Sequence, residues 1–393
     1  MKELLDMLNQ AGALQREGRP FAVGTVVRIG GSTYRRPGAR MLVAEDGRRW
    51  GTVSGGCLEG EVTQRALHVL ETSRPELLPF DLDDDDLIFG FGTGCNGVAH
   101  VLLEPVPVEG RASPIDLLNR CVEDRHTGLL ATVIDVEPGL QDSLARHLLL
   151  LDDGSLHGDL EGSPLFERVR DHARHVMAEH AASSDPYVWE TQVYTLDAGK
   201  AEVLYERVLP PVQLVIFGEG HDVGPLVRFA AGLGWRVQVV GRKPAAELQE
   251  RFPDAEAWTY LMHPEEALKH VTVDSRTAVL VMNHTYLRDR RLLQTLLEAT
   301  PLRYIGMLGP RERTARIITE VEMNQPLTDD QRARIYGPIG LDIGTETPEE
   351  IALATLAEVQ AVLHGRPAGF LREREAPIHG GRAGLPTTIS SWP

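Results

Sequence analysis

Two of the three cysteines in this chain lie in glycine-rich segments. Cys57 belongs to residues 51–61 (GTVSGGCLEGE), and Cys95 belongs to residues 92–97 (GTGCNG). Glycine adopts backbone conformations that are closed to other residues, so main-chain amides and a sulfur can both approach a phosphate or a planar ring. These segments therefore predict ligand-binding turns with an accessible thiol. The alternative is steric, with Cys57 a small residue at a buried helix start and Cys95 one that fills a tight turn.

Two neighbouring features favour an anion in the same region. Residues 30–40 (GGSTYRRPGAR) hold three arginines between glycines, which predicts a loop that binds an anion. Apolar residues after Cys57 recur at helical spacing, so the Gly55-Gly56 turn is expected at a helix N-terminus. Helix N-termini attract anions, because their main-chain amides point outward and carry the positive end of the helix dipole.

Helical and strand-like patterns alternate through the first half of the chain, which predicts a mixed α/β domain over residues 1–209. A helix is expected from Glu3 to Arg16, and others over residues 114–124 and 163–179. Cys121 lies among apolar residues of the second of these helices, so we expect it in the core. The expected strands of this half cover residues 21–29, 40–45, 49–53, 98–103, 129–136, 148–151, 188–195 and 201–207.

A nucleotide-type β-α-β pattern begins after Pro210-Pro211, where a Rossmann-like domain is expected over residues 210–365. Residues 213–217 form an apolar strand, and residues 218–224 (GEGHDVG) follow it as a tight turn before a helix. The glycine spacing is G-x-G-x-x-x-G, so it indicates the fold better than a cofactor. The flexible tail is expected over residues 366–393, which lack periodicity.

The second strand of this domain ends without the acidic residue that binds the ribose hydroxyls of NAD. It runs instead into Gly241, Arg242 and Lys243. Two cations at this position favour a phosphate over a free ribose diol. The ligand is therefore NADP or a phosphorylated pterin, or the domain binds no dinucleotide.

Polar residues follow the later strands, which are expected over residues 278–282 and 303–307. In a doubly wound sheet the carboxyl ends of the strands form the ligand crevice. His221, Asn283, His284 and Arg311 are therefore expected to converge there, and the two histidines are candidates for acid, base or hydrogen-bond roles. The alternative is that each histidine only braces its own loop. A last helix is expected at residues 348–363, with a capping box at its start.

Composition limits the classes of partner. The chain has 57 acidic and 40 basic residues and a net charge of −17, which disfavours nonspecific binding to nucleic acid or anionic membranes. No apolar run approaches the roughly 20 residues of a membrane span. The N-terminus has no secretory pattern, so a soluble cytoplasmic protein with reduced cysteines is expected. The acidic residues at 81–86 are interpreted as a solvated loop rather than a metal site.

Several motifs together resemble the XdhC/CoxI family, whose members are maturation factors of xanthine and carbon monoxide dehydrogenases. The similarity spans roughly residues 10–364 with the motifs in family order, which is more specific than any one glycine pattern. The motifs are residues 32–38 (STYRRPG), 54–59 (SGGCLE), 94–95 (GC), 218–221 (GEGH), 304–309 (YIGMLG) and 338–344 (PIGLDIG). The sequence departs from the family form at Gly241, where an acidic residue is common, and at Asn283-His284-Thr285, where a histidine-aspartate pair is often seen.

The resemblance implies a chaperone that binds molybdenum cofactor (molybdopterin), supports its sulfuration through a cysteine desulfurase and delivers it to a molybdenum hydroxylase. It also suggests a homodimer. Arg35 and Arg36 would contact anions, and Cys57 and Cys95 would contact molybdenum or transferred sulfur. The residues expected to bind the cofactor are Arg35, Arg36, Gly55, Gly56, Cys57, Glu59, Cys95, Gly218, Gly220, His221, Arg242, Asn283, His284, Gly309, Arg311 and Asp342.

Three function classes remain open. The first is a cofactor-insertion factor without turnover of its own, and the second is an NADP-dependent oxidoreductase with His221 or His284 as the acid. No complete dehydrogenase acid and base set is evident, and a simple dehydrogenase would leave the glycine-cysteine segments unexplained. The insertion factor is therefore favoured. The third class, a small-molecule sensor, would keep the pockets without requiring either cysteine.

Overall fold

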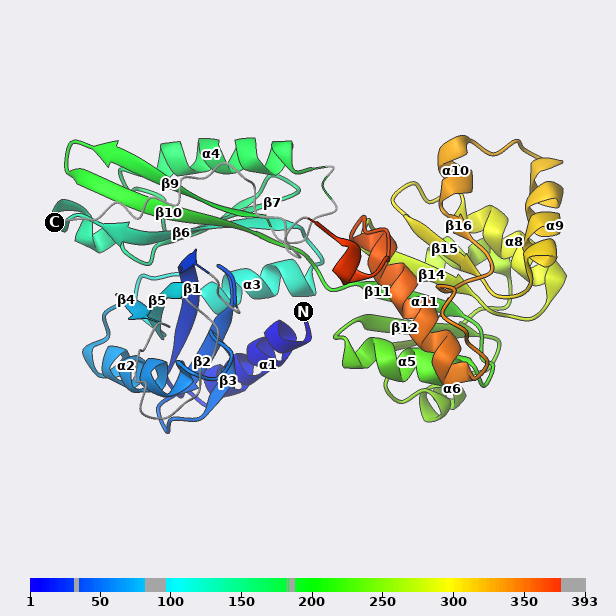
Figure 1. Cartoon of the computed structure of the whole chain (residues 1–393), viewed down its shortest axis with the longest axis horizontal. Coiled ribbons are helices and arrows are strands. Elements are labelled where there is room, and N and C mark those ends of the chain that lie inside the picture. Colours follow the sequence, from blue (N-terminus) through cyan, green and yellow to red (C-terminus); the bar gives the residue numbers. More distant parts are fainter. Residues whose placement is uncertain (32–34, 82–96, 182, 184–187, 376–393) are drawn as a thin grey trace. The chain divides into compact units, whose positions relative to one another are not determined.

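The computed structural model describes residues 1–31, 35–81, 97–181, 183 and 188–375. These residues form two compact units, one over Glu3–Pro210 and one that begins at Pro211 and includes Met1–Lys2 (Figure 1). Cys95, the acidic run after Asp81 and the end of the predicted tail lie outside the described residues. The fold class predicted from the sequence is confirmed: a mixed α/β unit is followed by a Rossmann-like unit with a parallel sheet.

The first unit contains two antiparallel sheets of the same topology. The strand orders are β3-β2-β1-β5-β4 and β8-β7-β6-β10-β9, so each strand of the second sheet has a counterpart in the first. The strands of the first sheet are β1 (Phe21–Gly31), β2 (Arg40–Ala44), β3 (Arg49–Gly51), β4 (Glu76–Asp81) and β5 (Gly97–Val106). The strands of the second are β6 (Gly128–Val136), β7 (His147–Leu151), β8 (Leu156–Gly158), β9 (Trp189–Leu196) and β10 (Gly199–Val208).

Four helices complete the same pattern twice. Helix α1 (Lys2–Arg16) precedes β1 as α3 (Pro114–Glu123) precedes β6, and α2 (Glu59–Thr72) follows β3 as α4 (Phe166–Glu179) follows β8. Apolar side chains of α1 and α3 share one core cluster with both sheets, and α2 and α4 each pack on the outer face of one sheet (Figure 1). Cys121 is fully buried on α3, as the sequence predicted.

The correspondence between the halves extends to single hydrogen bonds and to sequence. Thr25 pairs with Arg40 in the first sheet as Thr132 pairs with His147 in the second. The amide of Gly38 donates to Val26 O at 2.9 Å, and the amide of Ala145 donates to Val133 O at the same distance. Residues 41–72 align without a gap to residues 148–179, with glycines at matching turns. The first unit is therefore an internal duplication, which local sequence patterns did not predict.

Two buried ion pairs cross between the duplicated halves. Arg40 on β2 contacts Glu206 on β10 at 2.5 Å, with 7% and 8% of the two side chains exposed. In the converse arrangement, His147 Nε2 on β7 lies 2.7 Å from Glu104 Oε1 on β5. Each pair thus joins a strand of one sheet to a strand of the other. Since buried charges are costly unless paired, these contacts fix how the sheets pack.

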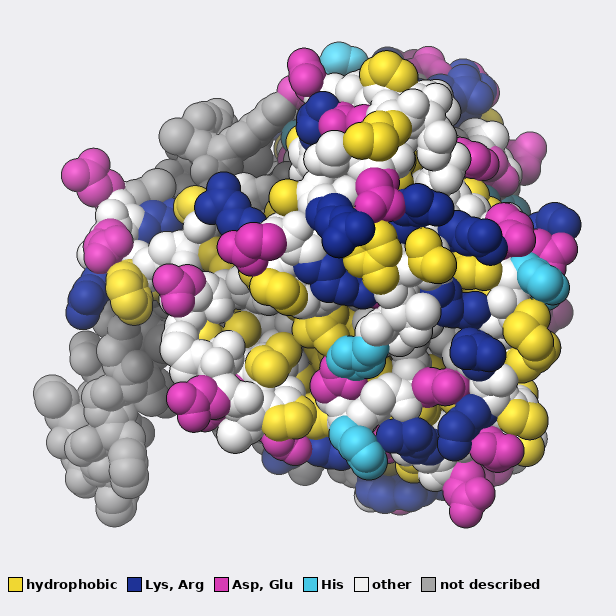
Figure 2. Space-filling view, turned by 90° about the vertical axis from the view of Figure 1, so that its right-hand side faces the viewer, with side chains coloured by type: hydrophobic (Ala, Val, Ile, Leu, Met, Phe, Trp, Pro, Cys, Tyr) yellow, Lys and Arg dark blue, Asp and Glu magenta, His cyan; other side chains and the backbone are white. Residues whose placement is uncertain are grey.

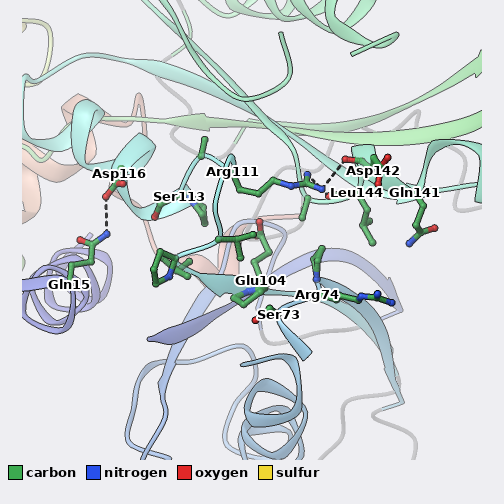
Figure 3. A pocket seen from close by; sticks show the side chains of 18 residues that line it. Gln15, Ser73, Arg74, Glu104, Arg111, Ser113, Asp116, Gln141, Asp142 and Leu144 are labelled. Atoms are coloured by element: carbon green, nitrogen blue, oxygen red, sulfur yellow. Dashed lines mark hydrogen bonds between the residues drawn. The ribbon is translucent and has the colours of Figure 1, made fainter. Parts of the chain in front are cut away.

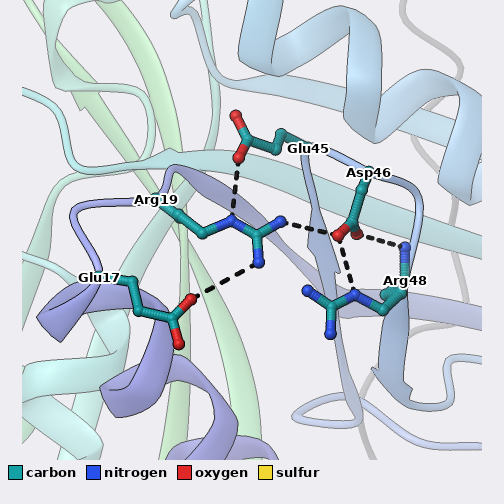
Figure 4. A network of polar contacts seen from close by, with 5 residues as sticks. All are labelled: Glu17, Arg19, Glu45, Asp46 and Arg48. Carbon is teal, nitrogen blue, oxygen red and sulfur yellow. Dashed lines mark hydrogen bonds and ion pairs between the residues drawn. The ribbon is translucent and has the colours of Figure 1, made fainter.

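A surface network ties the end of α1 to the turn between β2 and β3 (Figure 4). Arg19 contacts Glu45 at 3.0 Å and Asp46 at 2.7 Å, and Asp46 also accepts from Arg48 Nε at 2.8 Å. The Arg19 guanidinium and the Arg48 amide lower the pKa of Asp46 to about 2. Exposed pairs of this kind contribute little to stability, so the network mainly orders the turn.

The second unit is a six-stranded parallel sheet of order β13-β12-β11-β14-β15-β16. Its order reverses between β11 and β14, which is where doubly wound sheets bind ligands. The strands are β11 (Gln213–Phe217), β12 (Arg236–Gly241), β13 (Ala257–Tyr260), β14 (Thr277–Val281), β15 (Tyr304–Met307) and β16 (Ile335–Tyr336). The helices are α5 (Val223–Gly232), α6 (Ala245–Arg251), α7 (Ala267–His270), α8 (Tyr286–Leu296), α9 (Arg311–Glu322), α10 (Asp329–Ala333) and α11 (Pro348–Leu363).

Helices cover both faces of this sheet, as two separate core clusters show. The predicted capping box at Thr347 and Glu350 is confirmed at the start of α11. In the part of the chain that the structure describes, none of the helices is both long and apolar enough to cross a bilayer.

The crossed pairs predict a large effect of removing one charge. Arg40→Met leaves the Glu206 carboxylate buried without its partner, so the free energy of unfolding should fall by about 3–5 kcal/mol. Denaturant unfolding of the full chain measures this value. Arg48→Met, which removes an exposed arginine, serves as the matched control and should change stability by less than about 1 kcal/mol. Equal effects of the two changes would contradict the proposed role of the crossed pair.

The His147–Glu104 pair predicts a pH dependence. Burial disfavours the imidazolium, but the Glu104 carboxylate outweighs it and raises the pKa of His147. A raised folded-state pKa gives stability that is complete below the unfolded value of about 6.5 and is lost as pH rises through the folded-state value. The stability difference between wild type and His147→Gln should therefore shrink as pH rises above about 6.5. Thermal unfolding across this range checks it, and a difference independent of pH would refute it.

Candidate functional site

The Cys57 loop connects β3 to α2 in the first half of the duplicated unit. Cys57 and the two glycines before it are exposed. Gly56 has a φ of 118°, a conformation that side chains rarely adopt, and open space surrounds the position of a Cβ. The loop therefore presents a sulfur and main-chain groups to solvent directly before the first turn of a helix, as the sequence predicted.

Ser54 and Glu59 hold this loop in place. The Glu59 carboxylate accepts from the Ser54 amide at 3.0 Å and from the Ser54 hydroxyl at 2.7 Å. The Ser54 hydroxyl in turn accepts from the amides of Gly56 and Leu58, each at 3.1 Å. Burial would raise the pKa of Glu59, but these hydrogen bonds outweigh it and keep the pKa below its usual range. Glu59 is 4% exposed and acts as a brace beneath the loop.

Arg35 lies beside the same loop. Its guanidinium donates to Glu3 Oε1 at 2.8 Å and to the hydroxyl of Thr52, which also donates to Glu3 at 3.0 Å. Arg35 thus connects the β1–β2 loop to the segment that leads to Cys57, although a carboxylate already contacts its guanidinium. Arg36 is half-buried on the β1–β2 loop. Cys95 lies outside the described residues, so its predicted contact with molybdenum or transferred sulfur stays a prediction.

In the second unit, the loops after β11 and β14 meet at the point where the strand order reverses. His284 Nε2 lies 3.4 Å from Asp222 Oδ2, and a Cβ on Gly220 would lie 2.2 Å from Asp222 Oδ1. Gly218 is equally constrained, since a Cβ there would lie 2.7 Å from Met282 O. Gly218 is therefore required by the close approach of the two loops, whereas the nearest contact at Gly220 lies within its own loop and His284 Nε2 would lie 3.3 Å from its Cβ.

The Asp222–His284 pair has three features of a functional site. His284 has a φ of 56°, in the left-handed region that residues other than glycine rarely adopt. Asp222 Oδ1 is buried without a hydrogen-bond partner among the residues that the structure describes. His284 is 61% exposed, so its ring is accessible to a ligand. A carboxylate-imidazole pair of this kind can bind a donor group or move a proton.

A buried network fixes the loop that carries His284. Asp289 is 1% exposed, accepts from Asn283 Nδ2 at 2.9 Å and pairs with Arg313 at 2.6 Å. Arg288 donates to the Asn283 side chain and to the carbonyls of Leu261 and Met262. Burial, together with the nearby charge of Arg242, lowers the pKa of Arg288. Asn283 thus helps to position its loop, and its predicted cofactor contact stays a prediction.

Two carboxylates occupy the positions at which a Rossmann fold binds a phosphorylated nucleotide. Glu219 accepts from the amides of Arg242 and Lys243 at 3.1 and 3.2 Å, directly after β12. A Cβ on Gly241 would lie 2.6 Å from Glu219 Oε2, so the glycine makes room for this carboxylate. Asp222 is the N-cap residue of α5, where the pyrophosphate of a dinucleotide is bound in such folds. Both negative charges oppose a phosphate, and the geometry gives the NADP prediction no support.

The remaining predicted residues of this unit are mostly exposed. His221 directly precedes Asp222 and is exposed, as are Arg242, Arg311 and Asp342, and Gly309 has a φ of 123° in the turn before α9. Basic side chains gather on the face shown in Figure 2, among hydrophobic and acidic ones. Sequence reasoning missed Glu219, Asp222 and Asp289, although the acidic residues within the GEGHDVG turn were visible.

Two family models match the chain, one in each of its two units. The family model described as the XdhC Rossmann domain matches residues 214–359. The model of the XdhC and CoxI family matches residues 14–81 and 121–185, one segment in each half of the duplicated unit.

Relatives of known name extend over most of the chain. A Bacillus subtilis protein, named as a probable subunit of xanthine dehydrogenase, is 32% identical over 88% of this chain and 94% of its own. The Escherichia coli molybdenum cofactor insertion chaperone PaoD is 24% identical over 88% of this chain and 84% of its own. A crystal structure from Bacillus halodurans, described as a xanthine dehydrogenase, is 30% identical with a TM-score of 0.69 and covers 91% of this chain and 96% of its own. The chain belongs to the XdhC and CoxI family.

Proposed function

We propose that this protein binds molybdenum cofactor as a cargo, protects it and inserts it into a molybdenum hydroxylase of the xanthine dehydrogenase type. The observation that carries the proposal is the exposed Cys57 on a braced glycine loop in a member of this family. The names of two relatives, one a xanthine dehydrogenase subunit and one a cofactor insertion chaperone, support the same role.

The chemistry of the Cys57 loop suits this cargo. Molybdenum cofactor presents a soft, sulfur-bound metal, a flat pterin and a phosphate, and thiolate sulfur is a ligand that soft metals accept. The glycines at 55 and 56 allow the pterin or phosphate to approach the main chain. Because Ser54 and Glu59 hold the loop, little conformational entropy is lost when the cargo binds. No residue of this loop needs to turn over a substrate, so the protein acts as a carrier.

The proposal includes three partners. A cysteine desulfurase would supply sulfur to the bound cofactor, the client hydroxylase would receive it in the cytoplasm, and the carrier would act as a homodimer. Exposed apolar side chains on the second unit are available for such contacts, among them Leu287, Met323, Ile343 and Leu353, whose exposed fractions lie between 53% and 78%.

NADP-dependent oxidoreduction is the alternative class. It requires a phosphate near β12 or the N-terminus of α5, where Glu219 and Asp222 already place negative charge. The alternative therefore needs both carboxylates to be neutralised or displaced. Cofactor carriage needs neither change, since it uses the first unit.

Cys57→Ala tests the proposal directly. Purified full-length protein is loaded anaerobically with molybdenum cofactor, and the retained pterin is measured by fluorescence after release. Loss of the sulfur contact should weaken retention tenfold or more, which corresponds to about 1.4 kcal/mol. NADPH is titrated against the same samples and should not show saturable binding.

The duplication supplies a matched control. Pro164 occupies the position of Cys57 in the second half, so Pro164→Ala alters the equivalent loop and should leave retention unchanged. Cys95→Ala separates the contributions of the two predicted sulfur contacts. If wild type binds NADPH and retains no pterin, the carrier function is wrong.

A further inference from the structure

A cavity of about 550 Å³ lies in the first unit, between the end of β5, the start of α3 and the β6–β7 loop. This volume falls within the range of ordinary small-molecule sites, about 300–1,000 Å³. The cavity is separate from the Cys57 loop. Gln15 at the last turn of α1 lines the cavity, whereas Glu3 at the first turn contacts the segment beside Cys57. At 1.5 Å per residue these points are about 18 Å apart along the helix.

The floor of the cavity carries a buried acceptor. Glu104 is 5% exposed and lines the cavity, and His147 holds one of its oxygens at 2.7 Å. A carboxylate has about four acceptor positions, so it can receive further N–H groups from a ligand. The hydroxyl of Ser113 also lines the cavity and is buried without a hydrogen-bond partner among the described residues. The Ser113 hydroxyl thus lacks a partner among the described residues, and the Glu104 carboxylate has acceptor positions beyond the one that His147 fills.

Two cations and rigid apolar walls surround this floor (Figure 3). Arg111 fixes the β6–β7 loop by donating to Leu144 O at 3.1 Å and to Asp142 O at 2.9 Å, and Arg74 is exposed at the opposite side. The carboxylate of Asp142 also lies at the rim, and Asp116 accepts from Gln15. The apolar lining includes Pro75, Pro105, Val106, Pro107, Val108 and Pro114.

The other half of the duplication shows how the surroundings of Glu104 differ from those of its counterpart. Both carboxylates are buried, but Arg40 contacts Glu206 and a Cβ on Gly38 would lie 3.1 Å from its Oε2, whereas Glu104 borders the cavity. Gly38 belongs to the arginine-rich loop, whereas the corresponding loop of the second half holds Gln141 and Asp142 at the cavity rim. The two halves have therefore diverged, and only one of these buried carboxylates lines this cavity.

We propose that this cavity is a binding site for a flat anionic heterocycle that offers neighbouring ring and amino N–H groups, as guanine nucleotides and pterins do. The N–H edge donates to Glu104, the ring packs between the prolines, and the phosphate or carboxylate faces Arg74 and Arg111. This site is independent of the cofactor contact at Cys57, because the two lie at opposite ends of α1.

Calorimetric titration of the full chain with guanosine monophosphate, pterin-6-carboxylate and cytidine monophosphate tests the proposal. The first two offer the paired N–H edge and at least one should bind, while cytidine monophosphate lacks it and should bind at least tenfold more weakly. Binding of only one of the first two identifies which ring the site takes. Glu104→Gln should weaken the binding at least tenfold, since its amide cannot accept both N–H groups.

A cavity-filling change keeps the test valid if loss of Glu104 unfolds the protein. Val108→Phe places a ring in the cavity and should abolish binding, whereas Val193→Phe, on an exposed position of β9, should leave it unchanged. The proposal is overturned if neither guanosine monophosphate nor pterin-6-carboxylate binds, if cytidine monophosphate binds equally well, or if Val108→Phe binds like wild type.

Discussion

The first unit depends on the crossed ion pairs between its duplicated halves. Arg40 with Glu206 and His147 with Glu104 occupy corresponding positions, and each pair takes one strand from either sheet. A sheet with one such buried charge would be unstable alone, because an unpaired charge in the interior costs several kcal/mol. Each half therefore requires the other. Glu104 of one pair also lines the cavity at the last turn of α1.

Duplication allowed the halves to specialise. The first half keeps Cys57, Ser54 and Glu59 on its loop, where the second half has Pro164. The corresponding β6–β7 loop of the second half instead lines the cavity that Glu104 of β5 borders. The Rossmann-like unit shows a comparable change in the chemistry of a loop. The Glu219 carboxylate occupies the place beside β12 where other Rossmann folds bind a nucleotide. In both units a common fold was retained while the chemistry of its loops changed, which is why fold alone does not define function.

Local patterns predicted the elements well. The strand at residues 213–217, the last helix and its capping box, and the burial of Cys121 all follow from short-range periodicity. The duplication was harder to predict, since its evidence is a weak similarity between segments far apart in the chain. The role of Glu219 was also missed. The chain has no acidic residue directly after β12, and the Glu219 carboxylate reaches that place from the loop after β11. Such contacts depend on tertiary structure, which residue spacing does not encode.

We propose that the sulfur of Cys57 contacts the molybdenum of the bound cofactor. X-ray absorption at the molybdenum edge of cofactor-loaded protein, compared between wild type and Cys57→Ser, measures this contact. We expect one more sulfur neighbour of molybdenum in wild type than in the variant, with both proteins loaded to the same level. Identical molybdenum environments in the two proteins would show that Cys57 makes no such contact and has a purely steric role.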